Sequence, residues 1–171
     1  MKIRLCLAIV SLLSLTSLPL FAEDPSLAPS SAPDGAAQPD FGDYKSSTLT
    51  TKAWKALGEG DTATVKAYTQ KCIDSFEKQA LEMQKGITGP VSTDDKEAVF
   101  KNWALNDVGT CYFILGSALE KSGDKKGALE AYKTLAEKFP DAKCWDTKGW
   151  FWTPADAAKG KLKALEFDAI S

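Results

Sequence analysis

The fold is decided by the stretch GTCYFILGSALEKSGDKKGALEAYKTLAEKFPDA, residues 109–142. Apolar residues recur at helical spacing on both sides of its centre, which indicates two amphipathic helices. Between them Gly123-Asp124 predicts a turn, with Asp124 as the N-cap of the second helix. Pro140 is expected to end that helix. The spacing therefore predicts a helical hairpin whose helices cover at least 108–121 and 125–138.

Small and large residues in this hairpin follow a pattern with a steric reason. Gly116 and Ala128 are small, and we expect the two helices to cross closely there. Large side chains are expected to fill the seam, at Tyr112, Leu115, Leu119 and Tyr132. The arrangement resembles the 34-residue tetratricopeptide repeat, with tyrosine in place of the first tryptophan and leucine in place of the following tyrosine. The alternative is an ordinary helix-turn-helix within a bundle.

The remainder of the chain from residue 46 also shows helical periodicity. Gly60-Asp61 resembles Gly123-Asp124 but precedes it by 63 residues, so a second repeat is degenerate and a long solenoid is excluded. Pro154 follows a threonine that matches an N-cap and precedes Asp156 at the third helical position, which predicts a capping helix over 154–167. We therefore predict an all-α fold over 46–171: a short array of antiparallel hairpins ending in that helix.

The first 45 residues are expected to form no part of this domain. Residues 1–22 have a basic start, an apolar middle and a small-residue end, which is typical of a secretory signal peptide. The alternative is an uncleaved membrane anchor. Residues 23–45 hold four of the eight prolines and predict a disordered Pro/Ser/Ala-rich leader. We expect a periplasmic or secreted protein whose mature form does not span the membrane.

Composition excludes several classes of function. The chain has no histidine, so Ser-His-Asp and Cys-His catalysis and histidine-based metal sites are excluded. No motif predicts a cofactor or a metal. The formal net charge is −2 without a basic run, which argues against nucleic acid as a partner. Cys72 and Cys111 fall on apolar helix faces and suit the core; their pairing with each other or with Cys144 stays open.

A run of aromatic residues, CWDTKGWFWTPA over 144–155, follows the hairpin. With the preceding hairpin it is similar to a group of small exported bacterial tetratricopeptide proteins, and the similarity covers roughly residues 99–167. The resemblance implies export and a helical-repeat fold. Members of that group have sometimes been described as glucanase-related, but no motif in this sequence supports an activity of that kind.

Two binding hypotheses follow. In the first, the protein is an envelope-assembly module without catalysis that binds a protein or peptide partner in the groove lined by the first helix of each hairpin. When the groove positions of tetratricopeptide proteins are transferred to this hairpin, the residues expected to be exposed in the groove are Thr110, Phe113, Ser117, Glu120 and Lys121. In the second, the protein binds carbohydrate or cell wall through an aromatic surface of Trp145, Trp150, Phe151 and Trp152.

The aromatic run also has a structural interpretation. Residues 140–153 form a connection without predicted regular structure, and most of Trp145, Trp150 and Trp152 are expected to be buried there, packing it against the hairpin and the last helix. A glycoside hydrolase would require two facing carboxylates. Glu97, Asp146 and Asp156 are available, but no spacing singles out a pair, so we predict no catalytic residues.

Overall fold

The computed structural model describes residues 39–170, and this part of the chain is all-α, as predicted. Its helices are α1 (Ser46–Glu59), α2 (Thr62–Gly86), α3 (Lys96–Lys101), α4 (Trp103–Lys121), α5 (Lys125–Lys138) and α6 (Pro154–Ile170). Between α5 and α6 the chain adds an antiparallel pair of short strands, β1 (Cys144–Asp146) and β2 (Trp150–Trp152). The predicted signal peptide and residues 23–38 of the predicted leader lie outside the described residues.

The hairpins α1/α2 and α4/α5 turn in the same way. Gly60 and Gly123 adopt φ values of 76° and 86°, a left-handed conformation that favours glycine. The next residue, Asp61 or Asp124, donates its N–H to the carbonyl five residues earlier at 3.0 and 2.9 Å. Its carboxylate then accepts the N–H three residues later at 3.0 and 2.9 Å. The predicted N-cap Asp124 and both predicted helix ranges of the second hairpin are confirmed, and Asp61 caps α2 in the same way.

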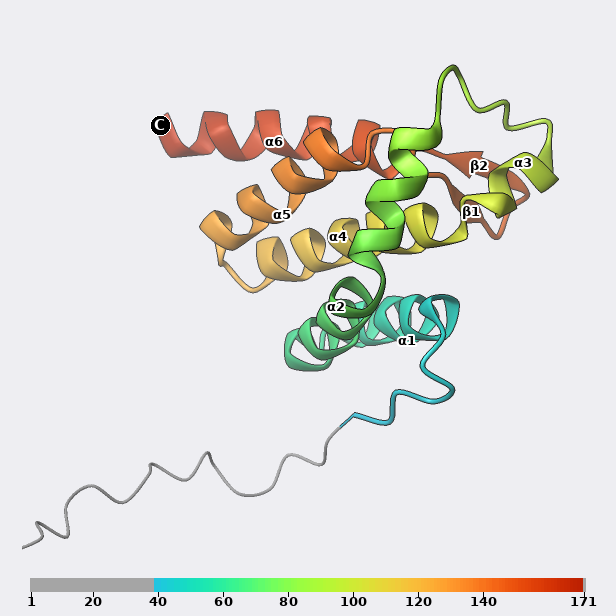
Figure 1. The fold of residues 1–171 in the computed structure, drawn as a ribbon. Coiled ribbons are helices and arrows are strands. Elements are labelled where there is room, and N and C mark those ends of the chain that lie inside the picture. The colour runs from blue at the N-terminus through green and yellow to red at the C-terminus, as the bar shows by residue number, and fades with distance from the viewer. Residues whose placement is uncertain (1–38, 171) are drawn as a thin grey trace, which may run out of the picture. The chain divides into compact units, whose positions relative to one another are not determined.

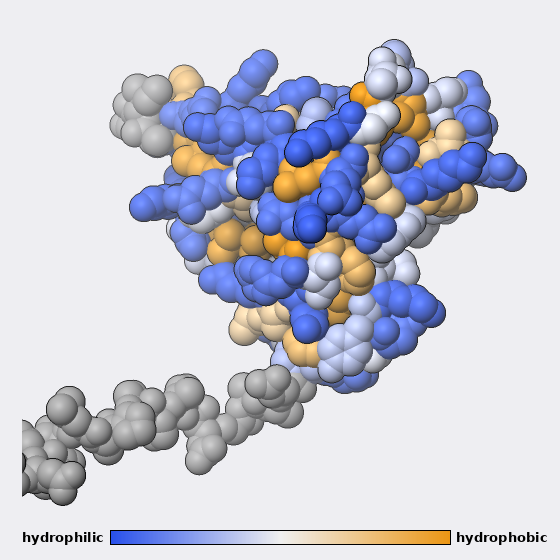
Figure 2. Space-filling model, in the orientation of Figure 1, coloured by the Kyte–Doolittle hydropathy of each residue, from blue (hydrophilic) through white to orange (hydrophobic). Residues whose placement is uncertain are grey.

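Helix α4 occupies the centre of the domain, where it packs against α1, α2, α5 and α6. Figure 1 shows α4, α5 and α6 side by side, with α2 running from beside α1 across this group, and with α3 and the two strands at one end. Hydrophilic residues cover most of the face shown in Figure 2. The largest fully buried side chains come from several helices and the α5 C-terminus: Leu49, Leu105, Ile114, Tyr132, Leu135 and Phe139.

The close crossing predicted at Gly116 is present, but its partner differs from the one expected. A Cβ atom on Gly116 would lie 2.6 Å from Cε1 of Tyr132, which is closer than two carbon atoms can pack. The predicted partner Ala128 is fully buried but is not among the atoms nearest this position. Glycine is therefore required at 116 because the Tyr132 ring lies flush against the α4 backbone.

The predicted end of the leader at residue 45 is too late. Phe41 packs edge-on against Tyr68 of α2, with ring centroids 5.9 Å apart. Asp40 forms an ion pair with Lys52 of α1 at 2.8 Å, and the same lysine donates to the Asp40 carbonyl at 2.6 Å. Residues 40–45 therefore belong to the folded domain. The sequence did not predict this, because the segment has only one strongly apolar residue, Phe41, and so shows no apolar periodicity.

Limited proteolysis tests this boundary. We expect brief digestion of the full chain to leave a core that begins near Pro39, because the contacts of Phe41 and Asp40 hold the following backbone against α1 and α2. Mass spectrometry of the fragments reads the boundary directly. Rapid cleavage after Lys45, at the same rate as cleavage before Pro39, would contradict the placement of residues 40–45.

The capping box predicted at the start of α6 is not formed. The hydroxyl of Thr153 accepts a hydrogen bond from Lys143 Nζ at 2.9 Å, so it is engaged across the chain. Asp156 instead forms an ion pair with Lys159 at 2.9 Å. The Thr153 carbonyl accepts the N–H groups of residues 156 and 157 at 3.1 and 3.3 Å. Helix α6 thus begins at the predicted residue, while the side chains expected to cap it serve other contacts.

Candidate aromatic cleft

The aromatic run forms a β-hairpin, which corrects the prediction of a connection without regular structure. Cys144 pairs with Trp152, Trp145 with Phe151, and Asp146 with Trp150. A three-residue loop joins the strands, and the Asp146 carboxylate accepts the N–H of Lys148 at 2.8 Å within it. The sequence did not reveal these strands because three residues are too few for a period-two pattern.

Burial of the tryptophans also differs from the prediction. Trp145 is 42% exposed and Trp150 is 50% exposed, so the prediction that most of the three indoles are buried is wrong. The physical reason is that the hairpin pairs its own backbone groups and does not depend on the indoles to hold it. Trp152 is the exception, since its half-buried ring lies 5.1 Å from that of Phe113 on α4.

The two exposed tryptophans do not form a single sugar-binding platform. Successive strand residues point to opposite faces, so the register places Trp145 with Phe151 on one face and Trp150 with Trp152 on the other. A lysine ammonium also covers each exposed ring, with Lys96 Nζ 4.8 Å from the Trp145 centroid and Lys148 Nζ 6.0 Å from that of Trp150. The coplanar strip required by the carbohydrate hypothesis is absent from this hairpin.

Single substitutions separate the roles of these rings. We expect Trp152→Ala to lower the free energy of unfolding by about 1–2 kcal/mol, because its half-buried ring packs against α4. Trp150→Ala on the same strand is expected to change it by less than about 0.5 kcal/mol, because its ring is half exposed. Urea unfolding of both variants measures the difference, and equal losses would contradict the assigned packing.

The predicted groove on α4 is largely occupied by the protein itself. Thr110 is only 2% exposed, so it was wrongly predicted to be an exposed groove position. Phe113 packs against Trp54, Tyr132 and Trp152. The Tyr132 hydroxyl lies 3.1 Å from Ser117 Oγ and donates to Glu120 at 2.9 Å, and Glu120 also pairs with Lys161 at 3.2 Å. Of these five residues, Lys121 is the only one that is exposed.

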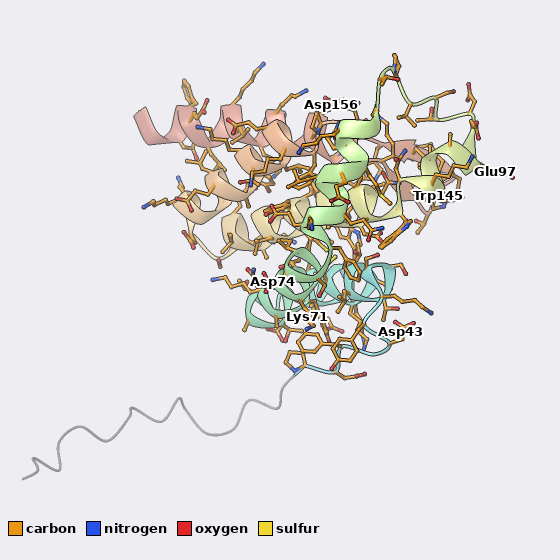
Figure 3. All side chains as sticks on the ribbon, viewed as in Figure 1. Asp43, Lys71, Asp74, Glu97, Trp145 and Asp156 are labelled. Atoms are coloured by element: carbon orange, nitrogen blue, oxygen red, sulfur yellow. The ribbon has the colours of Figure 1, made fainter. Side chains whose placement is uncertain are left out.

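A cleft lies instead where the start of α1, the start of α4 and the β-hairpin meet. It consists of two adjoining hollows of about 400 and 260 Å³ that share Ser47, Trp103 and Asp107. We call the two together the Asp107 cleft. Aromatic side chains make up much of its wall: Tyr44, Phe76, Phe100, Trp103, Trp145 and Phe151. Figure 3 shows Trp145 at the end of the domain where α3 and the hairpin lie.

Asp107 provides the carboxylate of this cleft. Its Oδ2 accepts a hydrogen bond from the buried Ser46 hydroxyl at 2.5 Å. Burial raises the pKa of Asp107 above the ordinary carboxyl value, and the Ser46 hydrogen bond opposes this only in part. Every buried side-chain oxygen of the described residues has a hydrogen-bond partner. Oδ1 of Asp107 has none among these residues, so it is not fully buried, and Asp107 lines both hollows.

Two lysines border the cleft, and both are engaged elsewhere. Lys45 Nζ pairs with Asp43 at 2.8 Å, and Lys143 Nζ donates to the Thr153 hydroxyl at 2.9 Å. Among the ion pairs of residues 39–170, none involves Asp107. The cleft thus combines aromatic walls with a half-buried carboxylate whose charge has no cationic partner in the described part of the chain.

The carboxylates considered for hydrolysis have other roles. Asp146 closes the hairpin loop and Asp156 pairs with Lys159. Glu97 lies in the first turn of α3, where Asp95 caps the helix. Figure 3 shows Glu97 and Asp156 at separate places on the surface, so these two do not face each other across a cleft. No group of three His, Cys, Asp or Glu side chains in the described residues is placed to hold a metal ion.

The cysteines agree in part with the sequence analysis. Cys72 and Cys111 are fully buried in the core, as predicted. Both belong to the same core cluster. Burial raises the pKa of Cys111, and the neighbouring Cys72 raises it further. Cys144 is half-buried in the wall of the Asp107 cleft. All three are free thiols in the structure.

Sequence reasoning missed the Asp107 cleft because its residues come from four separate segments: 44–50, Phe76 on α2, 100–110 and 143–151. One local signal was present, since Trp103 and Asp107 are four residues apart and therefore share a face of α4.

No family model, curated protein or solved structure matches the chain. Within residues 39–170 no helix has both the length and the apolar composition needed to cross a bilayer.

Proposed function

We propose that this chain is an exported, tetratricopeptide-like module that binds a peptide segment of a partner protein in the Asp107 cleft. One observation carries the proposal. Two large aromatic side chains, Trp103 at 40% and Trp145 at 42% exposure, come from different segments and line the cleft together with a half-buried carboxylate. Apolar walls with a few polar groups are typical of ligand sites, and exposed aromatic residues supply much of the affinity when peptides bind.

The resemblance to tetratricopeptide proteins supports a binding role. The equivalent Gly60-Asp61 and Gly123-Asp124 turns, and the packing of α4 against both helices of the first hairpin, are what two stacked repeats followed by a capping helix require. A signal peptide at 1–22 would carry such a module into the periplasm or the medium, so the partner would be an envelope or exported protein. Hydrogen bonding of Asp146 and Asp156 within the chain favours binding without catalysis.

A pair of tryptophans on opposite faces of the β-hairpin provides the experiment. Trp145 lines the cleft and Trp150 does not, although both are about half exposed. The chain is tested against a library of randomised heptapeptides and, separately, against a soluble β-glucan, with binding measured by fluorescence polarisation. We expect Trp145→Ala to weaken peptide binding by at least about tenfold, the effect of losing one aromatic anchor, whereas Trp150→Ala leaves it unchanged.

The other outcomes contradict the proposal. Equal losses in Trp145→Ala and Trp150→Ala would show that peptides do not bind in the Asp107 cleft. Binding to the β-glucan without binding to any peptide would favour the carbohydrate hypothesis. Thermal melts of both variants serve as the control, since a peptide-binding loss in an unfolded variant carries no information about the cleft.

A further inference from the structure

We propose that the Asp107 cleft recognises an arginine side chain of the bound peptide, with its guanidinium paired to Asp107 and stacked on Trp103. This rests on the proposed function and specifies the chemistry of its ligand. The first support is the unbalanced charge of the cleft. Asp107 lines both hollows, its Oδ1 has no hydrogen-bond partner among the described residues, and its Oδ2 is held by Ser46. The two lysines at the border are bound to Asp43 and Thr153.

Keeping Asp107 charged costs free energy in the unliganded cleft. Burial raises the pKa of this carboxyl. In the free protein, therefore, no neighbouring group fully offsets the hydration that the ionised carboxylate loses. A cation bound at Oδ1 would supply that compensation and would itself lose little hydration in a cleft open to solvent. An anionic ligand would face uncompensated repulsion at the same position, so the cleft selects against acidic peptides.

The aromatic wall explains why arginine suits the cleft better than other cations. Trp103 lies beside Asp107 in both hollows, and its ring is held edge-on by Phe76 at a centroid distance of 5.6 Å. A planar guanidinium stacks on an indole face while its N–H groups donate to a carboxylate, which a lysine ammonium cannot do with equal area. The larger hollow, of about 400 Å³, has room for the side chain.

The protein already contains a related contact at the cleft wall. Lys96 Nζ lies 4.8 Å from the centroid of Trp145, so an indole of this cleft accepts a cation from α3. That contact uses Trp145 and leaves Trp103 without a cation partner among the described residues. The two tryptophans therefore have different roles: Trp145 forms part of the apolar wall, and the ring face of Trp103 contacts the guanidinium of the ligand.

Citrulline provides a matched neutral probe because it has the shape of arginine without the charge. Two heptapeptide libraries are compared, one with arginine and one with citrulline fixed at the central position, all other positions being randomised. We expect the wild-type chain to bind the arginine library at least about tenfold more tightly, as a charge-assisted hydrogen bond to a carboxylate implies. In Asp107→Asn, which retains an oxygen that can accept from Ser46, the preference should fall to less than about twofold.

Each outcome of the arginine–citrulline comparison either supports or overturns the assignment of arginine to Asp107. Equal binding of both libraries by the wild-type chain overturns the arginine assignment and leaves peptide binding intact. Binding of neither library overturns both the assignment and the proposed function. The wild-type comparison needs no variant, so the test stands even if Asp107→Asn does not fold. A preference for arginine that persists in a folded Asp107→Asn would place the cation elsewhere and overturn the assignment to this carboxylate.

Discussion

Replacing Phe139 with alanine is expected to lower the free energy of unfolding by about 3–5 kcal/mol, the range for deleting a fully buried aromatic ring. Phe139 has no exposed surface, and its ring stacks on Tyr112 of α4 with centroids 5.6 Å apart. It also ends α5, so its ring fixes the chain where the helix gives way to the β-hairpin. Urea unfolding followed by circular dichroism measures the loss.

Phe139→Leu is the matched control, because it keeps most of the apolar volume and should cost less than about 1.5 kcal/mol. The difference in unfolding free energy between the two variants is then the cost of the cavity that alanine leaves. If alanine and leucine at this position unfold at the same urea concentration, the ring does not fill the space between α4 and α5 that the structure assigns to it.

Gly116→Leu is expected to cost about 3 kcal/mol or more, which is at the upper end for overpacking. The first added carbon alone would lie 2.6 Å from the buried Tyr132 ring. Tyr132 has no exposed surface, and its hydroxyl is bonded to Glu120, so it has nowhere to move without breaking that bond. Thermal melting and urea unfolding both report the effect.

Gly160→Leu is the control for this substitution. Gly160 is also a helical glycine, on α6, but no atom lies within 4 Å of the place its Cβ would take. Exchanging glycine for leucine there should stabilise the helix by up to about 1 kcal/mol through helix propensity. Similar melting of Gly116→Leu and the wild-type chain would mean that α4 and the Tyr132 ring do not approach as closely as described.

The helical hairpins could be predicted because their signals are local. Capping by Asp61 and Asp124 depends on residues within one turn of a helix, and apolar spacing marks the buried face of each helix. The sequence even indicated the close crossing at Gly116. It could not identify Tyr132 as the contact, because the choice between Tyr132 and Ala128 depends on how the two helices rotate about their axes.

The β-hairpin and the Asp107 cleft could not be predicted for a different reason. Strands of three residues give no usable alternation, so the tryptophans were expected to fill a gap that backbone pairing closes. Thr153 illustrates the same difficulty, since its position matches an N-cap while its hydroxyl is bonded to Lys143 from the preceding segment. The cleft depends on the approach of α1, α4 and the hairpin, a long-range arrangement that no window of sequence contains.

The central position of α4 has a consequence for how the domain unfolds. Repeat arrays in which each hairpin contacts only its neighbours lose their ends first and show several transitions. Here α4 belongs to the second hairpin and packs against both helices of the first hairpin as well as against α6, so neither hairpin retains its core when the other opens. Amide hydrogen exchange should therefore be slowest in α4, and its exchange should require the same global opening that exposes α2 and α5. The domain is expected to behave as one cooperative unit rather than as two repeats.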